Sequence, residues 1–116
     1  MNQPDQMRIE KIIETAERLL RYIEENCVTG EQIETDYTLQ WTVTTPLYNI
    51  GEHTYHLTKE LKEQYPAVPW YQISGMRHRL VHQYEDTNWK IISHVIFHEL
   101  ANYVEQLKKI SEESLS

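Results

Sequence analysis

Apolar residues recur at every third or fourth position through most of the chain, and this spacing is the feature that most restricts its fold. The spacing is clearest in an N-terminal amphipathic helix whose apolar face consists of Ile9, Ile12, Ile13, Ala16, Leu19, Leu20 and Ile23. Asn26 and Gly30 are expected to end this helix, because both residue types tolerate a positive φ. The sequence has no strand-like alternation of useful length, so it predicts an all-α protein.

A second helical stretch runs from residue 35 to about residue 64 and contains a proline. Pro46 has no backbone N–H and its ring clashes with the preceding turn of a helix. The β-branched residues 42–45 come directly before it and are weak helix formers. We therefore expect this helix to be kinked or broken near Thr45.

Two further helices complete the predicted fold. Pro69 suits the first position of a helix, where its missing N–H costs nothing. Asp86 or Thr87 is expected to cap the last helix, and the tail at residues 111–116 is expected to fray. The apolar face of that last helix consists of Ile91, Ile92, Val95, Ile96, Leu100, Val104, Leu107 and Ile110. Because the connections are short, the sequence predicts an antiparallel four-helix bundle in a single domain over residues 1–116.

The charge balance limits the classes of function. The chain has 11 Lys and Arg against 18 Asp and Glu, a net charge of −7, which argues against a surface that coats nucleic acids or membranes. The single cysteine, Cys27, excludes an intramolecular disulfide and a Cys-rich zinc module, which favours a reducing compartment. No signal-peptide pattern is present, and no run approaches the roughly 18 apolar residues of a spanning helix. We expect a cytoplasmic protein that does not enter a membrane.

One segment does not fit a plain core helix. On an ideal helix, Arg77 falls at the centre of the apolar face formed by Trp70, Ile73, Leu80, Val81 and Tyr84. A guanidinium there needs a carboxylate partner or a cleft that receives an anion. His78 and His82 lie nearby, and all 18 acidic residues fall outside residues 64–84. A small cationic cluster on an acidic protein favours a site for one anionic group, such as a phosphate.

The arrangement Arg77-x4-His82-x-Tyr84, with a polar residue directly after the arginine, resembles the R-x4-6-H motif of HEPN domains. The flanking residues are similar to the HepT-like branch of that family, namely Pro69, Trp70, Ile73, Gly75, Met76, Leu80 and Val81, with Ile50, Gly51 and Glu52 upstream. The resemblance covers roughly residues 47–110. The residue after the arginine, most often Asn in this branch, is His78 here.

The resemblance implies an all-helical, metal-independent and cofactor-free endoribonuclease that serves as the toxin of a toxin–antitoxin pair. It also implies a homodimer that brings two motifs into one cleft, and a minimal nucleotidyltransferase (MNT) as the antitoxin. By the same resemblance, His82 is the catalytic histidine and Arg77 binds the phosphate. Tyr84 is then a candidate for AMPylation by the antitoxin, although a tyrosine on an apolar stripe is more commonly a packing residue.

The chemistry of RNA cleavage fits these residue types. RNA supplies its own nucleophile, the 2′-OH, so an enzyme needs a base, an acid and a cation for the charged phosphorane. Histidine suits both proton-transfer roles, with His78 or the second copy of His82 as the second proton carrier. The fork of Arg77 suits phosphate oxygens, and Glu52 is our candidate for orienting it, unless Glu52 is simply an exposed helix carboxylate. Arg79 points away from the stripe, either to contact RNA or to solvate the surface.

Two other functions are compatible with the sequence. His78/His82 and His94/His98 are i, i+4 pairs and His53/His56 is an i, i+3 pair, so a His-rich bundle could bind a transition metal. The sequence has no His-Glu-x-x-His or Glu-x-x-His motif, which counts against such a site. The other reading is a catalytically silent HEPN module that binds a nucleotidyltransferase or a nucleotide.

Overall fold

A computed structural model describes the backbone of residues 1–82 and 87–115 and the side chains of residues 1–80 and 87–114. Its elements in chain order are α1 (Gln3–Glu25), α2 (Gly30–Thr35), α3 (Tyr37–Tyr55), α4 (Lys59–Gln64), α5 (Trp70–His82), α6 (Trp89–His94), the π-helical turn η2 (Val95–Glu99) and α7 (Leu100–Leu115). The described part of the chain contains no strand, so the all-α prediction is confirmed.

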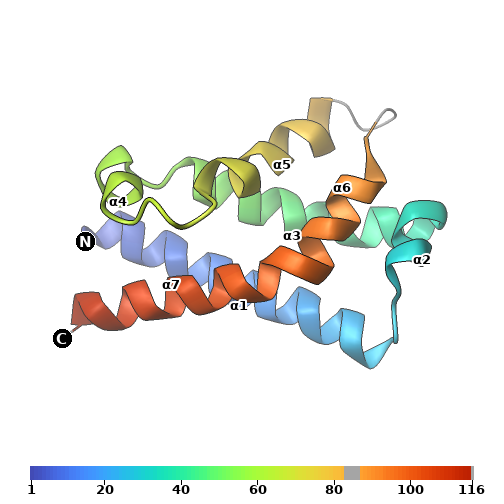
Figure 1. The fold of residues 1–116 in the computed structure, drawn as a ribbon, viewed down its shortest axis with the longest axis horizontal. Helices are drawn as coiled ribbons and strands as arrows, with labels where there is room; N and C mark the ends of the chain where they lie inside the picture. The colour runs from blue at the N-terminus through green and yellow to red at the C-terminus, as the bar shows by residue number, and fades with distance from the viewer. Residues whose placement is uncertain (83–86, 116) are drawn as a thin grey trace.

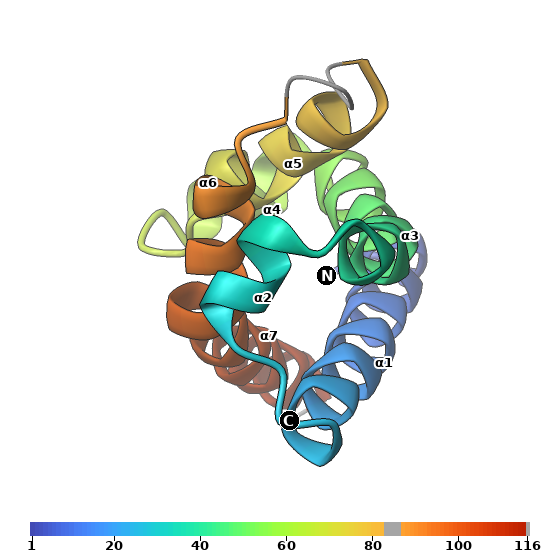
Figure 2. The same ribbon diagram turned by 90° about the vertical axis from the view of Figure 1, so that its right-hand side faces the viewer.

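The long helices alternate in direction, as Figure 1 shows: α1 and α5 run one way along the molecule, and α3 and the α6–α7 rod run back. The packed neighbours are α3 with α5, α1 with α3, and α1 with α7. Viewed from one end in Figure 2, the long helices surround a central region, and the short α2 crosses it. This arrangement is the predicted antiparallel bundle.

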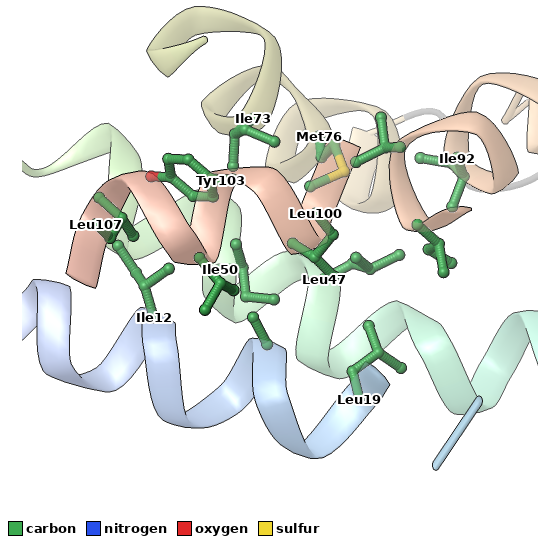
Figure 3. Close-up of a cluster of buried hydrophobic side chains, with 14 of the residues drawn as sticks. Ile12, Leu19, Leu47, Ile50, Ile73, Met76, Ile92, Leu100, Tyr103 and Leu107 are labelled. Atoms are coloured by element: carbon green, nitrogen blue, oxygen red, sulfur yellow. The ribbon is translucent and has the colours of Figure 1, made fainter. Parts of the chain in front are cut away.

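The apolar faces of all four long segments meet in one core. Figure 3 shows its centre, where Ile12 of α1, Ile50 of α3, Ile73 of α5 and Leu100 and Leu107 of α7 lie together, all fully buried. Burial of apolar side chains on this scale is the main favourable term in folding. The core therefore fixes how α3 and α5 face one another, which matters for the site below.

The end of α1 differs in detail from the prediction. The helix stops at Glu25, and the residue with positive φ is Cys27, at 52°, whereas Gly30 is the first residue of α2. Here the backbone N–H of Val28 donates to the carbonyl of Ile23, which closes the last turn around Cys27. The short helix α2 was not predicted from the sequence.

A kink or a break was expected near Thr45, and the break does not occur, because α3 runs through Pro46. The helix continues from Tyr37 to Tyr55, and Val43, Leu47 and Ile50 are fully buried on both sides of the proline. Burial of this face stabilises the helix across the missing hydrogen bond. The helical stretch is interrupted later, at residues 56–58, before Thr58 caps α4 through its hydroxyl.

The last two helical segments also begin and end differently. α5 begins at Trp70, with the carbonyl of Pro69 accepting from Ile73. Asn88 caps α6 by accepting from the backbone N–H of Lys90, while the hydroxyl of Thr87 donates to the carbonyl of Arg79. The alternative cap, Asp86, lies outside the described residues.

The predicted last helix is two helices joined by the π-helical turn η2. Fraying from residue 111 was also expected, but α7 continues to Leu115. Ser111 accepts a hydrogen bond from Gln6 of α1 at 2.9 Å, and Glu113 accepts one from Tyr65 at 2.9 Å. These contacts hold the end of the helix. None of the described helices is both long and apolar enough to cross a membrane.

Candidate active site

The backbones of helices α3 and α5 lie very close together at Gly51. A Cβ atom built on this residue would lie 3.0 Å from the backbone nitrogen of Arg77 and 3.2 Å from the carbonyl oxygen of Ile73. Both neighbours are backbone atoms of a packed helix, so neither can move away cheaply. The lack of a side chain at Gly51 therefore allows the crossing that brings the next residue of α3, Glu52, beside Arg77.

Arg77 lies on the buried face of α5, between Ile73 and Trp70, but is itself only half-buried. Among the described side chains of α5, the apolar residues that are buried are Trp70, Ile73, Met76 and Leu80, and Met76 was absent from the predicted face. The Arg77 side chain nevertheless keeps 30% of its surface exposed. The guanidinium is therefore within reach of a ligand from solvent.

Two residues of α3 hold the Arg77 side chain. Its Nη1 lies 3.5 Å from Oε2 of Glu52, and its guanidinium carbon lies 3.7 Å from the centre of the Tyr55 ring. The first contact is a long ion pair and the second is a cation–π contact on the ring face. Together they fix where the positive charge points while leaving it half-exposed.

Glu52 makes a second contact, which ties it to its own helix. Its Oε1 lies 2.9 Å from Nε2 of His56, one turn later. The hydrogen bond from His56 lowers the pKa of the Glu52 carboxyl, and the charge of Arg77 and a hydrogen bond from Tyr48 act in the same direction, against the opposing effect of burial. Glu52 is therefore ionised at neutral pH, which is the state that attracts Arg77.

The other predicted site residues follow Arg77 along α5. The side chain of His78 is exposed and that of Arg79 is half-buried. His82 is the last residue of α5, so its backbone lies about 7.5 Å along the helix axis from that of Arg77. Tyr84 lies outside the described residues. The structure thus brings Arg77 and Glu52 together and places Arg77 and His82 on one helix.

Tyr55 and His56 are neighbours of this cluster that the sequence analysis missed. Both contact a member of the pair formed by Arg77 and Glu52. A signal was present, because the two residues lie three and four positions after Glu52 and so share its face of a helix. Once Glu52 is considered as a partner for Arg77, its helical neighbours become candidates as well.

The histidine pairs whose side chains are both described, His53/His56 and His94/His98, do not converge on one site. His56 is engaged by Glu52 and His53 by Nη1 of Arg8, while the rings of His94 and His98 lie 4.9 Å apart at η2. Within the described residues there is no group of three or more His, Cys, Asp or Glu side chains arranged to hold a metal ion. The alternative of a metal-binding His-rich bundle therefore has no support from the part of the chain that is described.

Comparison of the sequence with known proteins identifies a family and several relatives. The family model described as "Ribonuclease HepT-like" matches residues 9–110. A protein named "Putative RNase TTE0752" from Caldanaerobacter subterraneus subsp. tengcongensis is 32% identical over 102 residues, covering 88% of this chain and 89% of that protein.

Two other relatives are more distant. "Putative RNase MJ0127" from Methanocaldococcus jannaschii is 28% identical and covers 73% of this chain and 70% of its own length. "Probable ribonuclease HepT" from Thermococcus cleftensis is 24% identical and covers 88% of this chain and 91% of its own length. No solved structure matches the chain.

Proposed function

The chain belongs to the HepT-like ribonuclease family, and we propose that it is a metal-independent endoribonuclease whose active site is built around Arg77 and His82. The observation that carries this proposal is the state of Arg77: a half-exposed guanidinium, positioned by Glu52 and Tyr55 and five residues before a histidine on the same helix. The names of the relatives, which are described as ribonucleases, support the same activity.

Arg77 is proposed to bind the scissile phosphate. Its ion pair with Glu52 is long, at 3.5 Å, and both side chains are about 30% exposed, so the pair is weak. A phosphate offers the guanidinium two oxygens at once, which makes stronger, charge-assisted hydrogen bonds. Glu52 therefore positions Arg77 when no RNA is bound, and gives way to the phosphate when RNA arrives.

The proposed reaction needs two proton carriers. One histidine takes the proton from the 2′-OH as its oxygen forms a bond to phosphorus, and a second gives a proton to the departing 5′-oxygen as that P–O bond breaks. The products are a 2′,3′-cyclic phosphate and a 5′-hydroxyl. Arg77 stabilises the extra negative charge on the phosphorane. His82 is the first carrier, and the second is either His78 or His82 of a second copy of the chain.

A homodimer and an antitoxin complete the proposal. Two copies that join their motifs in one cleft would supply both histidines and double the cationic patch of residues 64–84. A minimal nucleotidyltransferase partner would silence this toxin by AMPylation of Tyr84, which the sequence motif singles out. Arg79, half-buried on the same helix, is proposed to contact RNA away from the scissile bond.

The proposal is tested by RNA cleavage in EDTA with the wild type, His82→Ala and Arg77→Ala. A matched control is Arg18→Ala, which removes an exposed arginine that is paired with Glu14 on α1. We expect the first two variants to lose cleavage and the control to keep it. An inert wild type, or a His82→Ala variant that cuts as fast as the wild type, would overturn the assignment.

Sedimentation of the same proteins tests the dimer. We expect the wild type and Arg18→Ala to sediment as dimers at the concentrations at which they cut RNA. An active protein that is monomeric there would remove the second copy of His82 from the mechanism and leave His78 as the second proton carrier.

A further inference from the structure

A second cationic group lies in a groove between α1 and α3. This α1–α3 groove is lined by Pro4, Met7, Arg8, Lys11 and His53 and has a volume of about 350 Å³. His53 follows Glu52 directly, so its side chain leaves α3 about 100° further around the helix. Glu52 thus meets Arg77 of α5, whereas His53 meets Arg8 of α1.

Arg8 and His53 are joined by a hydrogen bond that fixes the state of the histidine. Nη1 of Arg8 lies 3.2 Å from Nδ1 of His53. A guanidinium can only donate, so Nδ1 accepts and the imidazole is neutral with its proton on Nε2. Burial lowers the pKa of His53, and the charge of Arg8 lowers it further. His53 therefore supports Arg8 without neutralising its charge.

Arg8 has no counter-ion among the described residues. It is half-buried, yet none of their carboxylate oxygens lies within 4.0 Å of its guanidinium. Arg18 and Arg77 each have a carboxylate partner, whereas the half-buried Arg79, like Arg8, has none among the described residues. Arg8 differs from Arg79 because it lines the α1–α3 groove and is hydrogen-bonded to His53. Leaving a half-buried charge without a carboxylate is costly, and this chain has 18 acidic residues against 11 basic ones.

The nearby acidic residues are engaged elsewhere. Asp5, one turn before Arg8, is buried and accepts from the backbone N–H of Thr58 at 3.1 Å and from its hydroxyl at 2.6 Å. Glu10 accepts a hydrogen bond from Gln6. The second cation of the groove, Lys11, is exposed and lies 3.9 Å from Glu14. The charge of Arg8 is therefore left for a ligand.

We propose that the α1–α3 groove binds a phosphate group, with Arg8 as the main ligand, Lys11 as a second cation and His53 orienting Arg8. The groove also has an apolar side, because Met7 is 58% exposed and Pro4 is exposed beside it. A phosphate that carries a sugar or a base fits this mixture better than a bare anion. The source is either a phosphodiester of the RNA substrate, which rests on the proposed function, or a free nucleotide.

The first experiment titrates inorganic phosphate at constant ionic strength and follows the Cε1–H resonance of His53 by NMR. The test variant is Arg8→Gln, whose amide can still donate to His53, so the fold is kept. The control is Arg18→Gln on the same helix. We expect phosphate to shift the resonance in the wild type and the control but not in Arg8→Gln. A wild-type resonance that does not respond to phosphate overturns the proposal.

A second experiment identifies the source of the phosphate. A fluorescent single-stranded 2′-O-methyl oligonucleotide has no free 2′-OH and is not cut, so its binding can be measured as salt is varied. Each phosphate contact contributes about 0.7 to the slope of log K against log salt for single strands. If the groove holds an RNA phosphodiester, Arg8→Gln reduces the steepness of the salt dependence by about this amount, and Arg18→Gln leaves the steepness unchanged.

The outcomes separate this proposal from the proposed function. An unchanged slope in Arg8→Gln, with its phosphate response lost, supports the groove and assigns it to a free nucleotide. A lower slope without any phosphate response at His53 in the wild type overturns the groove, because Arg8 then acts only through long-range attraction. If phosphate shifts the His53 resonance of the wild type but the wild type does not cut RNA, the ribonuclease proposal is contradicted and the groove proposal stands.

Discussion

Replacing Gly51 by alanine tests the close crossing that places Glu52 beside Arg77. The added methyl group would lie 3.0 Å from the nitrogen of Arg77 and 3.2 Å from the carbonyl oxygen of Ile73. Gly75, on α5, is the matched control, because a Cβ there would meet nothing within 4 Å. Neither glycine has a positive φ, so alanine fits the backbone conformation at both positions.

The expected magnitudes follow from two opposing terms. In a helix interior, alanine is favoured over glycine by about 1 kcal/mol, and this gain applies to both variants. At Gly75 nothing opposes it, so Gly75→Ala should be more stable than the wild type by about this amount. At Gly51 the overpacking against backbone should cost about 1–3 kcal/mol. Gly51→Ala should therefore be about 1–3 kcal/mol less stable than Gly75→Ala.

Urea unfolding followed by circular dichroism measures this difference. In a domain of this size, 1 kcal/mol corresponds to a change in Tm of about 4 °C, so thermal unfolding should also separate the variants. We also expect Gly51→Ala to cut RNA more slowly than Gly75→Ala, since α5 must move away from Glu52 to accept the methyl group. Equal stabilisation of both variants would refute the reasoning, because it would mean that α3 and α5 are not in backbone contact at Gly51.

Three further predictions concern buried or charged contacts. The hydroxyl of Tyr103 lies 2.7 Å from that of Thr54 in the core, so Tyr103→Phe should cost about 1–3 kcal/mol in urea unfolding, and adding Thr54→Val should recover most of it; a double variant worse than the single one would contradict this. Asp5→Ala should cost about 1–3 kcal/mol by leaving the donors of Thr58 unpaired, and an unchanged unfolding midpoint would show that water replaces the carboxylate. The pKa of Glu52 is held below its ordinary 4.5 in the folded state, so the stability that its carboxylate contributes is present above pH 4.5 and is lost as the pH falls below that value. Glu52→Gln should therefore make the free energy of unfolding depend less on pH on the acid side, and a pH dependence identical to that of the wild type would contradict this.

The sequence predicts the bundle because its core positions are strongly periodic. The buried apolar residues of α1, among them Ile9, Ala16 and Ile23, all belong to the predicted apolar face. Predictions from the helix propensity of single residues were wrong where tertiary packing had the larger effect. Pro46 is a helix breaker by propensity, yet burial of Val43 and Leu47 on either side keeps α3 continuous.

The candidate active site could be predicted only in part from the sequence. The residue types and spacing of the motif on α5 can be found in the sequence, and Glu52 was singled out as the partner of Arg77. The partnership itself depends on the crossing at Gly51, which is a property of two packed helices rather than of either segment. The α1–α3 groove was not found, because Arg8 and His53 are 45 residues apart and neither belongs to a recognisable motif.

The pairing of α1 with α7 has a consequence for the order in which the chain can fold. Gln6 and Ser111 are hydrogen-bonded partners separated by 105 residues. During synthesis, α1 is therefore translated well before α7, the helix against which it packs. Closing so large a loop is entropically costly and is favoured only once other contacts exist. On the ribosome, the apolar face of α1 therefore remains partly uncovered until α7 has emerged. An enzyme that cuts RNA would thus complete its bundle only after α7 had been translated.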